Sequence, residues 1–159
     1  MSVPARQVTA LEIRAVLIPT SSERLLLPNA ALAEVIDFRE PTPPNRDAPA
    51  WMLGNIVWRQ RTLPVISVER LLGDHFNPQV PRLRIAVCHA LVTQRQRPLI
   101  GIVSRGIPRL VRVTRDTIEE TPDPPLDPDW PMLAQVHVND VYALIPDMER
   151  IERLLDATP

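Results

Sequence analysis

The side chains of this chain that could act as a nucleophile, a base or a metal ligand are few and far apart. The single cysteine, Cys88, is followed at once by His89, and neighbouring side chains of a β-strand point to opposite faces, so the two cannot form a local nucleophile–base pair. His75 and His137 are distant from His89, and the spacing of the three is not that of a zinc site. We therefore expect no bound metal and interpret Cys88 as a small buried side chain.

Motifs that bind phosphate groups are missing as well. The four glycines form neither G-x-G-x-x-G nor G-x-x-x-x-G-K-[ST], and the chain contains no lysine. The carboxylate pairs, Glu119 with Glu120 and Asp123 with Asp127, lie in proline-rich stretches, where a solvated surface is the usual role. The sequence predicts a protein that is not an enzyme and uses no cofactor.

Arginine beside a large aromatic ring points to a different chemistry, that of a protein interface. In the stretch GNIVWRQRTLPVISVERLLG, which begins at Gly54, Trp58 and Arg59 lie near the tip of an expected hairpin, and both residue types are typical interface anchors. Apolar and charged residues fall at other strand ends too: Leu32, Glu34, Ile107 and Arg109. These residues predict a surface that binds another protein.

Composition limits the kind of partner. The 159 residues carry a formal net charge of −1, from 18 basic and 19 acidic residues, and only 4% are aromatic. Without a long basic run or interleaved aromatic rings, nucleic-acid binding is not expected. No apolar run approaches the roughly 20 residues that cross a bilayer, and no signal-peptide segment is seen. We expect a cytoplasmic protein that does not insert into a membrane.

An internal repeat organises the chain. When WMLGNIV is aligned with WPMLAQV, Met52 falls on Met132, and further along Glu69 falls on Glu149 at the same offset of eighty residues. Several matches in one order at one offset indicate a duplication.

Within each half the apolar residues alternate as they do in strands. Asn139-Asp140 predicts a tight turn into VYALI, and the matching hairpin is expected to turn near Gln60-Arg61. Asp147 begins the one convincing amphipathic helix, with its apolar residues on a single face: Met148, Ile151, Leu154 and Leu155.

These elements predict an all-β fold with short helices. About ten short strands in two halves indicate two small β-barrels, each of which buries too little alone and must pack on the other. We expect the barrels over roughly residues 20–80 and 81–146, with the N-terminal strand able to cross over and a helix at the C-terminal end.

The hairpin stretch resembles the signature of CheW-like chemotaxis coupling domains, which has the form G-x-x-N-L-R-G-x-x-x-P-[IV]-[IV]-D-[LF]. LAEVI, from Leu32, is similar to the family's V-x-E-[IV] segment, and GIVSRGIPRLVRV, from Gly101, to its second strand pair. The resemblance covers residues 11–155. The positions of the hairpin that match in register are Gly54, Arg59, Pro64, Val65 and Ile66.

The resemblance implies two packed, five-stranded, SH3-like barrels without catalytic activity. It also implies a scaffold in which one surface binds the regulatory domain of a CheA-type histidine kinase, while a groove between the barrels holds the cytoplasmic tip of a chemoreceptor. Arg59 matches the signature arginine near that groove and Glu34 the acidic residue of the motif. Leu32, Val35 and Ile107 would provide apolar contacts to a receptor helix.

Several positions depart from the family pattern. Val57 replaces its asparagine, Gln60 its second glycine and Ser67 its aspartate. Arg105 and Arg109 stand where the family commonly carries acidic residues, which reverses the local charge and bears on the choice of partner. These departures resemble CheW-like proteins of the chemosensory systems that control type IV pili, the ChpC type.

Two other functions remain open at the level of sequence. A CheW-like competitor would bind only one of the two partners. A small-ligand-sensing β-barrel would contain a cavity between or within the barrels.

Overall fold

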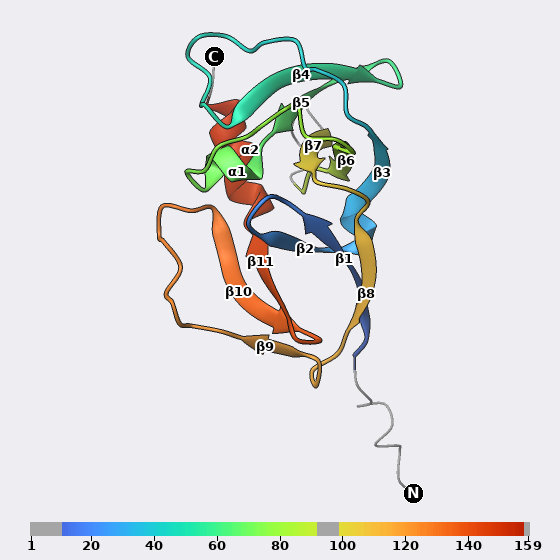
Figure 1. Cartoon of the computed structure of the whole chain (residues 1–159), viewed down its shortest axis with the longest axis vertical. Helices are drawn as coiled ribbons and strands as arrows, with labels where there is room; N and C mark the ends of the chain where they lie inside the picture. The colour runs from blue at the N-terminus through green and yellow to red at the C-terminus, as the bar shows by residue number, and fades with distance from the viewer. Residues whose placement is uncertain (1–10, 92–98, 158–159) are drawn as a thin grey trace, which may run out of the picture.

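The computed structural model describes residues 11–91 and 99–157, which fold into two β-sheets and two short α-helices (Figure 1). The strands are β1 (Ile13–Pro19), β2 (Arg24–Pro28), β3 (Leu32–Asp37), β4 (Met52–Trp58), β5 (Arg61–Ile66), β6 (Arg84–His89), β7 (Leu99–Ser104), β8 (Arg109–Val113), β9 (Ile118–Glu120), β10 (Met132–Val138) and β11 (Val141–Pro146). The helices are α1 (Val68–Leu71) and α2 (Met148–Asp156), and a single 3₁₀ turn, η2 (Asn29–Ala31), precedes β3.

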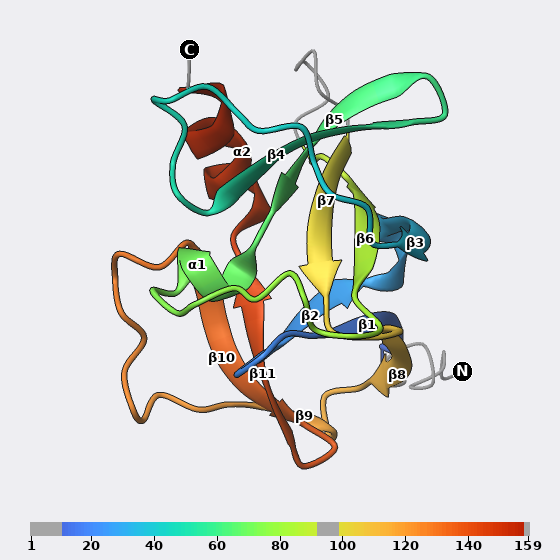
Figure 2. The same ribbon diagram turned by 45° about the horizontal axis from the view of Figure 1, so that its top comes forward.

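Apart from β9, the strands of the two sheets occupy corresponding positions, so that β3 corresponds to β8 and β4 to β10. The five-stranded sheet runs β3-β6-β7-β5-β4, and the six-stranded sheet runs β8-β1-β2-β11-β10-β9. Each contains one parallel pair, β5 with β7 and β11 with β2, in the same place in the order. In Figures 1 and 2 the five-stranded sheet lies above the six-stranded one. This arrangement confirms the expected all-β fold of two packed barrel-like units, with the three-residue strand β9 as an addition to the second.

The hairpins β4–β5 and β10–β11 correspond at the offset of eighty residues. Both have a register shift after their first residue, at Met52 and at Met132. Each closes with two residues at positive φ, Arg59 and Gln60 in the first and Asn139-Asp140 in the second. Such two-residue turns match the twist of the flanking strands. The first turn lies one residue earlier than expected, because Trp58 pairs with Arg61 as the last rung of the ladder.

The division of the chain between the barrels differs from a boundary near residue 80. Strands β6 and β7 pair with β3 and β5 in the first sheet, and β1 and β2 pair with β8 and β11 in the second. Each repeat thus contributes its first two strands to the sheet of the other repeat. The sequence-based division allowed only the N-terminal strand to cross over. Alternation within a strand identifies its faces but not its neighbour, so the exchange of β2, β6 and β7 was not visible in the sequence.

The largest core cluster lies between the sheets. It combines side chains of both, such as Val16 and Leu25 from one and Ile66 and Ile102 from the other, and we call it the inter-sheet core. The helix α2 adds Met148, Ile151 and Leu155 to it, whereas Leu154, expected on the same face, is 40% exposed. Two smaller clusters fill the individual barrels.

Glycine is required at position 54, where φ is +141°. A Cβ atom there would lie 1.9 Å from the carbonyl oxygen of Thr42. Thr42 and Asn55 form an isolated β-bridge, so the segment after β3 folds back onto β4. Since β3 and β4 are the two outer strands of this sheet, the contact helps to close the sheet into a barrel.

Candidate partner-binding site

Three of the expected site residues come together at the tip of the β4–β5 hairpin. The indole Nε1 of Trp58 donates a hydrogen bond of 2.7 Å to Oε2 of Glu34, and Nη2 of Arg59 lies 3.0 Å from Oε1 of the same carboxylate. The guanidinium carbon of Arg59 is 4.7 Å from the centre of the Trp58 ring. We call Glu34, Trp58 and Arg59 the tip cluster.

The tip cluster joins the two outer strands of the five-stranded sheet, because Glu34 lies on β3 and Trp58 at the end of β4. Trp58 packs against the core of the first barrel, while the side chain of Arg59 is 69% exposed. An exposed ion pair contributes little to stability. The cluster therefore closes the barrel through the indole and presents the guanidinium to solvent, where it can contact a partner.

Leu32 and Val35 lie on the side of β3 that faces the other sheet. They stand opposite Cys88 and Ala86, which belong to the inter-sheet core. A register shift between Leu32 and Glu34 turns the glutamate to the other face, where it reaches the tip cluster. Both apolar residues are partly buried, and Leu32 packs against the inter-sheet core.

Arg109 is the first residue of β8, and Ile107 lies in the loop just before it. Ile107 is 73% exposed, among the most exposed large apolar side chains of the described residues. With Leu17, Pro19 and Arg24 they line a small hollow of about 180 Å³. That both residues contact a partner stays a prediction.

Arg105 lies in a different environment from the other expected site residues. Its Nε is 3.8 Å from Oε2 of Glu69, whose side chain is fully buried, and the same oxygen accepts a hydrogen bond of 3.0 Å from the backbone N–H of Ser21. The side chain of Arg105 is 31% exposed. Arg105 therefore approaches α1 through its side chain and donates a hydrogen bond to Pro19 of β1 through its backbone N–H, and little of its side chain is available to a partner.

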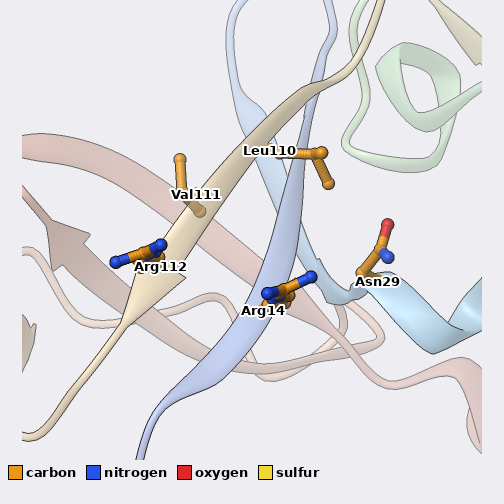
Figure 3. Close-up of a pocket in the computed structure, with 5 residues that line it drawn as sticks. All are labelled: Arg14, Asn29, Leu110, Val111 and Arg112. Carbon is orange, nitrogen blue, oxygen red and sulfur yellow. The ribbon is translucent and has the colours of Figure 1, made fainter.

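A larger hollow, of about 390 Å³, was not expected from the sequence. Its lining residues come from β1, η2 and β8: Arg14, Asn29, Leu110, Val111 and Arg112 (Figure 3). We call it the β8 groove. The signal that could have found it is the segment RLVRV, in which two arginines enclose two apolar residues on an outer strand of a sheet.

No group in these surfaces is suited to catalysis. Burial raises the pKa of the Cys88 thiol to about 12, so it stays protonated. Within residues 11–91 and 99–157 no three His, Cys, Asp or Glu side chains gather as a metal site would require. No helix in these same ranges is long and apolar enough to span a membrane.

Comparisons with known proteins agree with this architecture. A family model described as the CheW-like domain matches residues 14–154. The solved structure of the scaffolding protein TtCheW from Thermoanaerobacter tengcongensis superimposes with a TM-score of 0.68 at 18% identity, covering 86% of this chain and 89% of that one. No curated protein matches. CheW-like domains are non-catalytic scaffolds, which confirms the expectation that the chain is not an enzyme.

Proposed function

Since this chain belongs to the CheW-like domain family, we propose that it is a cytoplasmic scaffold that joins chemoreceptors to a CheA-type histidine kinase. The observation that carries the proposal is the extent of the family match, which includes both barrels and the hairpin with the tip cluster. The kinase would contribute its regulatory domain and the receptor its cytoplasmic tip. A neighbour in structure that is itself called a scaffolding protein supports the same role.

Arg59 is the residue on which we would test the proposal. Its guanidinium is exposed and contacts both Glu34 and the Trp58 ring, which favours one orientation before a partner arrives. Pre-organised arginines are frequent anchors of protein interfaces. Leu32, Val35 and Ile107 would add apolar contacts with the receptor.

The experiment is a calorimetric titration of the protein with the regulatory domain of a CheA-type kinase and, separately, with a receptor-tip fragment. We expect both to bind, and Arg59→Ala to weaken at least one about tenfold. Arg46→Ala, at an exposed loop position, is the control and should bind as the wild type does. Binding of only one partner would favour the competitor function, and binding of neither would refute the scaffold.

We further propose that the scaffold serves a chemosensory system that controls type IV pili. The support is the resemblance to the ChpC type, together with the arginines at positions 105 and 109. Deletion of the gene should then impair twitching motility and leave flagellar swimming intact. Loss of swimming with normal twitching would contradict this assignment.

A second candidate function is that of a small-ligand sensor, and the β8 groove is the place to test it. Its volume of about 390 Å³ is enough for a small molecule. A metabolite that raises the melting temperature of the wild type, but not of a variant with Leu110→Trp in the groove, would support that function.

A further inference from the structure

The β8 groove combines an apolar surface with two arginines. Arg14 on β1 stands directly opposite Arg112 on β8, and two residues along each strand Val16 stands opposite Leu110. Opposed residues share a face of the sheet, and every second residue along a strand returns to that face. The two guanidinium groups therefore stand opposite each other at one level of the sheet, and Leu110, which is 67% exposed, follows them one step along the same face.

Like charges directly opposite each other on neighbouring strands are unfavourable. In the free protein Glu12 partly offsets this charge, since its Oε1 lies 3.2 Å from Nε of Arg112. Arg14 forms no ion pair with the residues that the structure describes. Carboxylates brought by a partner would complete the neutralisation.

The opposite wall of the β8 groove is formed by Asn29, from the 3₁₀ turn η2 just before β3 (Figure 3). The groove thus lies where β8 of one sheet approaches the start of β3 of the other. Beyond Asn29, Leu32 packs against the inter-sheet core, and Val35, opposite Ala86, lies farther along β3. An elongated occupant can contact both surfaces at once.

We propose that the β8 groove binds an acidic amphipathic α-helix, whose apolar stripe meets Leu110 and whose carboxylates beside that stripe pair with the adjacent Arg14 and Arg112. This inference rests on the proposed function, because the helix is that of the receptor tip. It adds a rule of selection: tips with Glu or Asp beside the apolar stripe bind, and tips with Lys or Arg there are rejected.

The test uses the full chain and a set of receptor-tip fragments. In Arg14→Gln/Arg112→Gln we expect the affinity for an acidic tip to fall about five- to tenfold in dilute salt. The control Arg39→Gln/Arg46→Gln removes the same charge from exposed positions outside the groove, and should change the affinity less than twofold. Added salt should weaken binding of the wild type more than that of the groove variant.

A charge exchange makes the test specific. Arg14→Glu/Arg112→Glu should lose the acidic tip and gain a tip whose flanking carboxylates have been changed to lysine. If Arg14→Gln/Arg112→Gln binds the acidic tip as tightly as the control Arg39→Gln/Arg46→Gln does, the inference about the groove is wrong while the scaffold function stands. If no receptor tip binds the wild type, the inference and the scaffold function both fail. If the groove variants instead dissolve a dimer seen by sedimentation, the occupant is a second copy of this chain and the inference is also wrong.

Discussion

Two glutamates at equivalent positions of the repeat lie in opposite environments. The carboxylate of Glu69, in α1, is fully buried against Arg105 and the backbone of Ser21. The side chain of Glu149, in α2, is 58% exposed and lies 4.0 Å from Arg153. A buried carboxylate is tolerated only where partners replace water. Glu69 therefore connects α1 of the first barrel with two loops that leave strands of the six-stranded and five-stranded sheets.

We expect Glu69→Gln to lower the free energy of unfolding by about 1–3 kcal/mol, because the amide cannot balance the charge of Arg105. Glu149→Gln is the matched control at the equivalent position of the second repeat and should change the free energy of unfolding by less than about 0.5 kcal/mol. Urea denaturation of the two variants gives the comparison. Equal losses would mean that the buried contact contributes nothing.

Cys88 allows a prediction about pH. Burial raises the pKa of its thiol to about 12 from 9.0, so above pH 9 the unfolded chain loses a proton that the folded chain keeps. The stability that this proton contributes is complete below pH 9 and is lost as the pH rises toward 12. At pH 8 a disulfide reagent should modify the thiol only after denaturation. Rapid modification of the native protein would contradict the burial.

At the scale of elements, the tip of the β4–β5 hairpin carries backbone strain that the family pattern avoids. Arg59 and Gln60 have φ values of 48° and 66°, a region that side chains with a Cβ atom enter only at a cost. The signature that the hairpin resembles has glycine at the position of Gln60.

Gln60→Gly should therefore raise the free energy of unfolding by about 0.5–1 kcal/mol, the relief of strain being partly offset by the greater freedom of glycine in the unfolded chain. In the control Gln79→Gly, where φ is not positive, stability should fall slightly. Thermal unfolding measures both. A loss of stability in Gln60→Gly would show that the side chain makes contacts worth more than the strain.

Hairpins between neighbouring strands could be predicted from the sequence, whereas pairings between distant strands could not. The hairpin that turns at Asn139-Asp140 was predictable, because both residues favour positive φ and alternating strands flank them. The partners of β1 and β2 were not, since pairing between residues far apart leaves no local pattern. The same limit explains the β8 groove, whose Arg14 and Arg112 are brought together only by strand register.

For the whole molecule, the exchange of strands predicts that neither repeat can fold alone. A cut in the exposed loop after α1, between Asn77 and Pro78, leaves β1 and β2 on one fragment and their partners β8 and β11 on the other. Each fragment should lack cooperative unfolding by circular dichroism, and mixing the two should restore it. Cooperative unfolding of either fragment alone would contradict the prediction.

The parallel pairing of β2 with β11 also constrains the order of events during synthesis. Leu25 leaves the ribosome about 120 residues before its neighbour Leu144. At about 5–20 residues per second, the apolar strands β1 and β2 wait some 6–24 s without the sheet that will cover them. Strands β1 and β2 can pair with each other early, but the edge of β2 that takes up β11 stays open until Leu144 has been made, so we expect the nascent chain to bind chaperones that act at the ribosome.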